Sequence, residues 1–248
     1  MKKQIVMMMV AVLVCCTSCV KMKMNLNDIR KLEPSDNVVK NEYRMKPFSK
    51  VDIDLVARVK FKQSADGDYR VLLRCPDNYV DLFKFEVEDD ELELSFAENQ
   101  PKSIDAKDVA IIICSPTLSK LDSEGIGSVT IDSLTTPSLH LESEGVSNIH
   151  IKGLATETLT VESTGVGNIV LQGVAKTVSF ECEGVGNISA EELKADEVKA
   201  EINGVGSIAC FASERISGDV NGVGSLKYGG QPKEKRLQRN GVGKITEL

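Results

Sequence analysis

Apolar and polar residues alternate with a period of two over most of the chain, which is the pattern of half-buried β-strands. Before residue 119, residues 50–63, 69–75, 83–96 and 108–115 alternate or run apolar, and turn sequences such as ADGD and CPDN separate them. The phrase EVEDDELEL predicts a β-hairpin closed by a two-residue acidic turn. No segment beyond the first 18 residues has a convincing helical period, and the predicted fold class is therefore all-β.

From residue 119 onward the pattern repeats. A phrase of the type GVGNI begins at Gly125, Gly145, Gly165, Gly184, Gly204, Gly222 and Gly241, in steps of 18 to 20 residues. A fixed period of this length is typical of a solenoid, in which each repeat buries its apolar side by stacking on its neighbours. The sequence therefore predicts a parallel β-helix or β-solenoid with repeats of about 20 residues, preceded by a less regular β N-terminal part.

Alignment of the copies on their first glycine predicts which positions face the core. The positions four residues before and four residues after this glycine are mostly apolar, and the position directly after it always holds Ile or Val. We expect all three positions to form ladders of core side chains. The glycines are expected to be structural turn residues at a corner, where positive φ or close backbone approach excludes a Cβ. The Ser or Asn that follows is expected to bond local backbone.

The N-terminus predicts an export signal. Lys2 and Lys3 precede an apolar run, residues 5–14, that is too short to span a bilayer. The run ends in VCCTSCV, which resembles the lipobox of lipoprotein signal peptides, so Cys19 is the predicted lipid-anchor residue. The alternatives are acylation at Cys16 and an ordinary secretory signal.

The predicted organisation has three parts. Residues 1–18 form a lipoprotein signal peptide, residues 19–45 a tether, and residues 46–248 a single β-solenoid-like domain, with less regular strands over 46–118 and GVGNI-type repeats over 119–248. The mature protein is expected to be held on a membrane by its lipid anchor.

Two acidic columns accompany the predicted corner. Asp122, Glu142, Glu162, Glu181, Glu201 and Asp219 stand three residues before the first glycine, and Glu124, Glu144 and Glu183 stand one residue before it. Strand parity places both columns on one outward strip. We interpret the strip first as a solvated face that keeps the solenoid soluble. The alternatives are a Ca²⁺-binding strip, since Ca²⁺ takes several carboxylate oxygens, and a surface for a basic partner.

Composition and motifs exclude several classes of function. The net charge of −7 counts against nucleic acid as a partner, and 4% aromatic residues without Trp count against an aromatic platform for sugars. The chain has no GxSxG motif or phosphate-binding glycine loop, and its repeated carboxylates lack the unlike environments that catalytic pairs need. His140 and His150 are interpreted as surface variation. The prediction is a non-enzyme that needs no cofactor, with Ca²⁺ as the one ion left open.

Four cysteines follow the signal region: Cys75, Cys114, Cys182 and Cys210. Their spacing matches no metal-binding pattern. Cys182 and Cys210 fall in apolar columns of the repeat and are predicted to be buried free thiols. A disulfide between Cys75 and Cys114 stays open as an alternative, because an exported chain permits one.

Several phrases in a fixed order resemble a known family. The order is FSKVDIDLVARVKFKQ, CPDN, FEVEDDELELSF, DVAIIICSPTLSKLDSEGIGSV, repeated EGVGNI units and a closing LKYGGQPKEKRLQRNGVGKI. It resembles the head GIN domain family of proposed auto-transporter adhesins, which are envelope lipoproteins of certain Gram-negative bacteria. The resemblance covers roughly residues 40 to 248 and implies a β-solenoid-like fold and a role at the cell envelope, without a catalytic motif.

The expected function is that of an adhesin or envelope-interaction module. Its repetitive β face is expected to engage an unknown protein or glycan partner through many weak contacts. A periplasmic structural lipoprotein is the alternative, and a polysaccharide-active β-helix enzyme is a less favoured one. The sequence leaves open which face of the outer membrane the protein occupies.

Overall fold

The structure is a computed structural model that describes residues 32–98 and 104–248. The predicted signal peptide, the predicted anchor residue Cys19 and the first part of the predicted tether lie outside the described residues. The described residues are nearly all-β, with 73% of them in strands, which confirms the predicted class. Over the described ranges, no helix combines the length and apolar character needed to cross a membrane.

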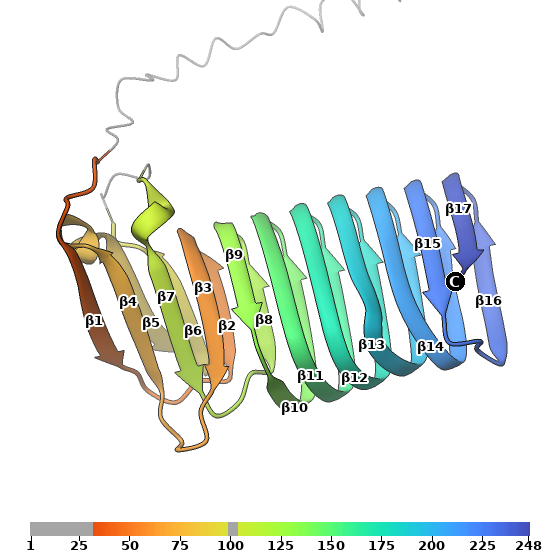
Figure 1. Ribbon diagram of the computed structural model, residues 1–248, viewed down its shortest axis with the longest axis horizontal. Coiled ribbons are helices and arrows are strands. Elements are labelled where there is room, and N and C mark those ends of the chain that lie inside the picture. The colour runs from red at the N-terminus through yellow and green to blue at the C-terminus, as the bar shows by residue number, and fades with distance from the viewer. Residues whose placement is uncertain (1–31, 99–103) are drawn as a thin grey trace, which may run out of the picture. The chain divides into compact units, whose positions relative to one another are not determined.

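The strands join in one hydrogen-bonded sheet that coils along a long axis (Figure 1). The first strands are β1 (Val38–Arg44), β2 (Lys50–Asp54), β3 (Val56–Gln63), β4 (Arg70–Pro76), β5 (Phe83–Glu88), β6 (Glu91–Phe96), β7 (Ala110–Ser115), β8 (Lys120–Ser123) and β9 (Ile126–Ile131). They are followed by β10 (Leu134–Ser143), β11 (Val146–Ser163), β12 (Val166–Cys182), β13 (Val185–Ile202), β14 (Val205–Val220), β15 (Val223–Gly229), β16 (Glu234–Arg239) and β17 (Val242–Glu247). Two short 3₁₀ helices are η2 (Asp77–Leu82) and η3 (Ala106–Asp108).

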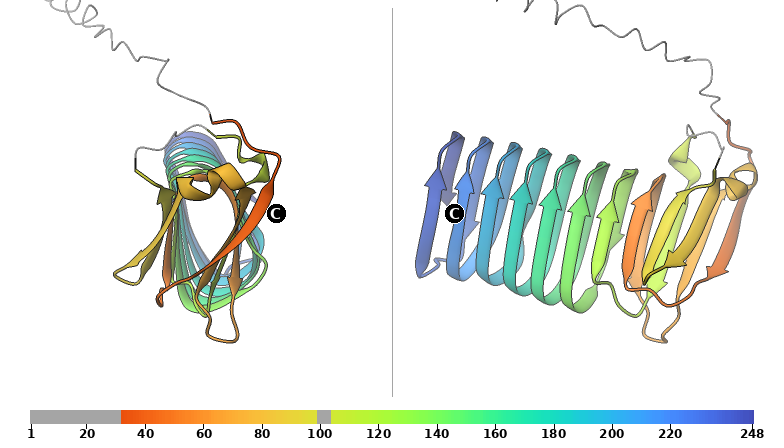
Figure 2. Two further views of the ribbon diagram at one scale, coloured as in Figure 1. Left: turned by 90° about the vertical axis from the view of Figure 1, so that its left-hand side faces the viewer. Right: turned by 180° about the vertical axis from the view of Figure 1, so that it is seen from behind.

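From β8 to β17 the chain forms a regular parallel solenoid. Each turn pairs in parallel with the next, so that Glu142 lies opposite Glu162 and Glu162 opposite Glu181. Seen end-on, the coil is flattened, with strands on two facing walls (Figure 2). The solenoid has about 6 turns with roughly 20-residue spacing, which confirms the prediction from the repeat.

The N-terminal part is less regular, as expected, and its stacking order differs from its chain order. The coil of β2 and β3 pairs in parallel with β6 and β7 on one side and with β8 and β9 on the other. It therefore lies between two coils that both follow it in the sequence. On one wall, β4 pairs antiparallel with both β1 and β7. Because β1 spans residues 38–44, the folded part begins before the boundary predicted at residue 46.

The predicted acidic hairpin is present as β5 and β6. These strands pair antiparallel, with Phe83 opposite Phe96 and Glu88 opposite Glu91. The two turn residues, Asp89 and Asp90, have φ of 49° and 67°. Positive φ at both central residues is the geometry of a two-residue type I′ turn, which aspartate tolerates better than most residues.

Two of the three predicted core columns are confirmed. Leu141, Val161 and Phe180, four residues before the first glycine, are buried, as are Ile149 and Ile169, four residues after it. The prediction for the third column is wrong, because the Ile or Val directly after the first glycine is exposed in every copy. Side chains alternate along a strand, so positions one and four residues after the glycine cannot both face inward.

Close backbone approach explains the corner glycines. A Cβ on Gly165 would lie 2.2 Å from the carbonyl oxygen of Gly145 in the turn below. Positive φ is not the reason, because Gly165 is not among the positive-φ residues of the chain. The corner therefore repeats glycine because successive turns stack there backbone on backbone.

Candidate binding surface

The exposed apolar column forms a ridge along the corner of the solenoid. We call it the valine ridge, and it consists of Ile126, Val146, Val166, Val185, Val205, Val223 and Val242. Each of these side chains is 50% to 74% exposed. Neighbouring members are register partners on adjacent strands, for example Val166 with Val185. At the spacing of hydrogen-bonded strands, six steps extend the ridge over about 29 Å.

The surface around the ridge is open rather than enclosed. A shallow groove of about 510 Å³ follows its middle part, lined by Val146, Val166, Val185 and Val205, by the corner glycines, and by Glu144, Thr164 and Glu183. At the N-terminal end a larger depression of about 710 Å³ has Val56, Phe96 and Ile126 in its lining. An open apolar strip of this kind suits contact with an extended surface better than it suits enclosure of a small substrate.

Two asparagine ladders flank the ridge. On one side Asn148, Asn168 and Asn187 stack, with Nδ2 of Asn168 donating to Oδ1 of Asn148 at 3.3 Å and Nδ2 of Asn187 donating to Oδ1 of Asn168 at 3.0 Å. On the other side Asn203, Asn221 and Asn240 are linked by two bonds of 3.0 Å. The expectation that these asparagine side chains bond local backbone is therefore wrong, because they bond one another between neighbouring turns. Such bonds hold the amide groups beside the ridge in fixed positions.

The structure brings the predicted acidic columns into line on one wall. Register pairs Glu162 with Glu181 and Glu181 with Glu201 on neighbouring strands. Burial, followed by repulsion from Glu183 and Glu201, raises the pKa of Glu181. Like charges in such a ladder oppose one another across the sheet.

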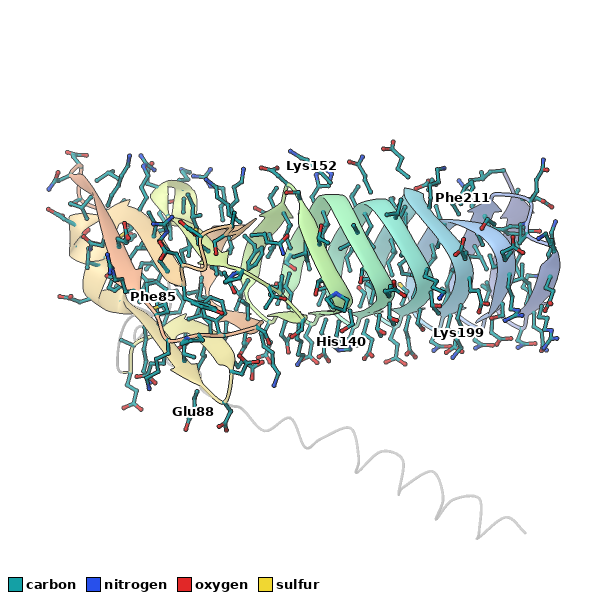
Figure 3. All side chains as sticks on the ribbon, turned by 90° about the horizontal axis from the view of Figure 1, so that it is seen from below. Phe85, Glu88, His140, Lys152, Lys199 and Phe211 are labelled. Atoms are coloured by element: carbon teal, nitrogen blue, oxygen red, sulfur yellow. The ribbon has the colours of Figure 1, made fainter. Side chains whose placement is uncertain are left out.

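Basic side chains interrupt this acidic wall. Lys120 lies 3.3 Å from Asp122 and 3.4 Å from Glu142, and Lys199 lies 2.8 Å from Glu201. His140 and Lys199 project on the same side of the solenoid (Figure 3), and Nε2 of His140 lies 3.6 Å from Glu142. The wall is thus a mixed-charge surface over part of its length, whereas binding of a cation or a basic partner along it stays a prediction.

One cluster involves a residue that sequence reasoning missed. Asp52 in β2 lies opposite Asp122 in β8, and carboxylate oxygens of Asp52, Asp122 and Glu124 all lie within 4.8 Å of one another. Burial, followed by repulsion from Glu124, Asp122, Glu91 and Glu93, raises the pKa of Asp52 to about 7. The pKa of Glu124 is also raised, by burial and then by Asp122. The available signal was the phrase VDID at 51–54, which matches LDSE at 121–124 in its acidic positions.

Among the described residues, no cysteine or histidine belongs to a group of three potential metal ligands. Cys75, Cys114, Cys182 and Cys210 are all free and buried, so the alternative of a bridge between Cys75 and Cys114 is not realised. Burial raises the pKa of Cys75 to about 11 and that of Cys210 to about 12. His140 and His150 are partly buried rather than freely exposed, and Nε2 of His150 is buried without a hydrogen-bond partner among the described residues.

Several solved structures are similar to this chain. One is a crystal structure of a putative adhesin from Bacteroides fragilis, with 39% identity over 88% of this chain and 100% of that chain and a TM-score of 0.85. A putative lipid binding protein from Parabacteroides distasonis has 19% identity and a TM-score of 0.70, over 88% of this chain and 100% of that one. A putative adhesin from Parabacteroides merdae has 17% identity and a TM-score of 0.65, over 88% and 99%. The last two likenesses show the fold alone.

The family comparison covers most of the described domain. No functionally curated protein is significantly similar to the chain. The family model described as "putative auto-transporter adhesin, head GIN domain" matches residues 47–232, which contain strands β2 to β15 and six of the seven valine-ridge residues. The chain therefore belongs to the head GIN domain family.

Proposed function

We propose that this protein is a non-enzymatic lipoprotein of the cell envelope that is anchored through Cys19 and binds a partner along the valine ridge. The single observation that supports this most is the ridge itself, because seven evenly spaced β-branched side chains stay at least half exposed. Contiguous exposed apolar surface on a folded domain commonly marks an interaction site. The adhesin description of the family and of the Bacteroides fragilis relative supports the same function.

The flanks of the ridge indicate what kind of partner fits. Toward the N-terminal end the neighbouring column carries Glu124, Glu144 and Glu183, and toward the C-terminal end it carries Asn203, Asn221 and Asn240. An extended protein segment with apolar side chains on one face and basic or amide groups at its margin is complementary to both ends. Each turn contributes a small contact, and the rigid stack adds these contacts together.

The binding experiment compares the full chain with variants of the ridge. Val166, Val185 and Val205 are changed together to Ser, and Val174→Ser is the matched control, because Val174 is 55% exposed but lies outside the ridge. Binding of each form to immobilised matrix proteins and to a glycan panel is then measured. We expect the triple variant to lose binding and the control to retain it. Equal binding by the triple variant and the unaltered chain would reject the ridge as the binding surface.

A second measurement tests the location. Cells that express the protein are treated with protease, intact or after permeabilisation, with a periplasmic protein as control. Loss of the protein from intact cells supports adhesion at the surface. Protection until permeabilisation would instead support the alternative of a periplasmic structural lipoprotein.

A further inference from the structure

The geometry points to a Ca²⁺ site formed by Asp52, Asp122 and Glu124, at the joint between the N-terminal coils and the regular repeats. This inference is independent of partner binding along the valine ridge. It also differs from a cation strip along the whole acidic wall, because it places one ion at one joint and depends on Asp52, which lies outside the repeats.

The distances among the carboxylates suit a shared ion. The oxygens of Asp52, Asp122 and Glu124 all lie within 4.8 Å of one another. Oxygens bound to one Ca²⁺ at 2.3–2.6 Å are separated by at most about 5 Å across the ion. For Mg²⁺, at 2.0–2.1 Å, the corresponding limit is about 4.2 Å. The cluster is therefore compact enough for Ca²⁺, and water can supply the remaining positions that Ca²⁺ requires.

Two oxygens in the cluster lack the partners that burial normally demands. Asp122 is only 8% exposed, and its Oδ1 is buried without a hydrogen-bond donor in the described part of the chain. The same holds for Oδ1 of Asp52. Oδ2 of Asp122 faces Lys120 at 3.3 Å, which satisfies one side of that carboxylate alone. Leaving a buried charged acceptor without a partner costs free energy, and a bound cation removes that cost.

The surroundings of Asp52 add further negative charge. Asp52 lies in register between Glu93 of β6 and Asp122 of β8, so three adjacent strands each present a carboxylate. A small cavity of about 230 Å³ beside them is lined by Asp52 together with Glu86, Glu88, Asp89, Glu91 and Glu93. Like charges directly opposite one another destabilise a sheet, and a divalent cation converts that repulsion into attraction.

The regular repeats do not reproduce this arrangement. Across residues 32–98 and 104–248, the cluster at Asp52 is the one group of three potential ligands this close together. Farther along the wall Thr164 interrupts the column that holds Glu124 and Glu144, and Lys199 pairs with Glu201 at 2.8 Å. A specific site is thus expected at the joint and not at each turn.

The position of the site explains what the ion does. Asp52 belongs to the inserted coil of β2 and β3, whereas Asp122 and Glu124 belong to the first regular turn. An ion shared between them holds together two coils that are neighbours in space and about 70 residues apart in the sequence. Binding is therefore expected to stabilise the joint.

The test uses the full chain, stripped of metal with a chelator and titrated with CaCl₂ by calorimetry and thermal melting. We expect one saturable site, with a dissociation constant on the order of 10⁻⁴–10⁻³ M, as in extracellular calcium modules. At saturation the melting temperature is expected to rise by about 5 °C. Asp52→Asn and Asp122→Asn should abolish both responses, and Glu162→Gln, on the same column but away from the cluster, should keep them.

Each variant must retain the β-sheet circular dichroism of the unaltered chain. Two variants are used so that a folding defect in one of them does not decide the result. Absence of saturable heat with the unaltered chain would overturn the inference. Unchanged binding by both Asp52→Asn and Asp122→Asn would overturn it as well. If Glu162→Gln and Asp52→Asn lost equal amounts of binding heat, the heat would come from the acidic wall as a whole, and the single site would be rejected.

Discussion

Val166 lies directly opposite Val185 on the next turn of the solenoid, and the two side chains are 50% and 54% exposed. Three residues farther along each strand, Ile169 and Ile188 form the same kind of pair but are only 2% and 1% exposed. The same kind of β-branched side chain thus serves two purposes within one repeat. One column stabilises the core, and the other is held outward by a corner that stacks backbone on backbone.

The two columns should respond differently to truncation. Ile169→Ala is expected to lower the free energy of unfolding by about 2–5 kcal/mol, because it leaves a cavity in a stacked core. Val166→Ala is expected to change it by less than about 0.5 kcal/mol, as for most surface substitutions. Thermal or denaturant melting of the two variants checks this. A loss for Val166→Ala as large as that for Ile169→Ala would contradict the assignment of the ridge to the surface.

The corner glycines should be intolerant of a single methyl group. In Gly165→Ala the Cβ would lie 2.2 Å from the carbonyl oxygen of Gly145, so neighbouring turns must separate. We expect a loss of about 1–3 kcal/mol or more, which corresponds to a fall of at least several degrees in melting temperature. Gly229→Ala is the matched control, because its Cβ would meet its nearest neighbour, Phe211, at 3.7 Å. Equal melting temperatures for the two variants would contradict the close approach.

The repeat was the most informative feature of the sequence. Equal spacing of the copies places Glu142 beside Glu162, because turns of the same length stack in register. Strand parity also predicts the outer side of the wall for the acidic columns, but Asp122 is an exception to the expected solvated face, because it is only 8% exposed. The same parity argues against Val166 in the core, yet its apolar character suggested the opposite. Hydrophobic identity was misleading here because an apolar residue need not be buried, and β-branched residues also suit exposed positions of a strand.

The cluster at Asp52 could not be found in this way. Its formation depends on the insertion of the β2–β3 coil between two coils that follow it in the chain. Local alternation predicts that residues 50–63 form strands but does not specify which coil lies above them. The match between VDID and LDSE indicates that the two phrases hold equivalent positions in their coils. It does not specify that these coils are neighbours, so the contact between Asp52 and Asp122 depends on long-range stacking.

The cysteines should be inert in the native state. Cys75, Cys114, Cys182 and Cys210 are free and buried, and burial raises the pKa of Cys210 to about 12. The thiolate is the reactive form, so the native protein should react very slowly with a thiol reagent at pH 8. In denaturant the same four thiols should react rapidly. Fast labelling of Cys75 or Cys210 in the native protein, detected by mass spectrometry, would show that these turns open readily.

Stability should depend on pH through Asp52. Burial and then repulsion from Glu124, Asp122, Glu91 and Glu93 raise its pKa from 3.8 to about 7 in the folded state. The nearby cation Lys120 pairs with Asp122, two residues farther along the same strand, at 3.3 Å. At pH values between about 4, the pKa of Asp52 in the unfolded chain, and about 7, its pKa in the folded protein, the folded protein holds a proton that the unfolded chain has released. The stabilisation from this group is therefore complete below about pH 4 and is lost as the pH rises through 7.

Asp52→Asn keeps position 52 uncharged at every pH and should remove this loss. In chelator-containing buffer, where no divalent cation offsets the repulsion, the variant and the unaltered chain should melt at similar temperatures near pH 4. The variant should become more stable by several degrees as the pH approaches 8. Melting curves recorded across this range give the difference directly. A difference that stays constant with pH would mean that Asp52 ionises equally easily in the folded and unfolded states.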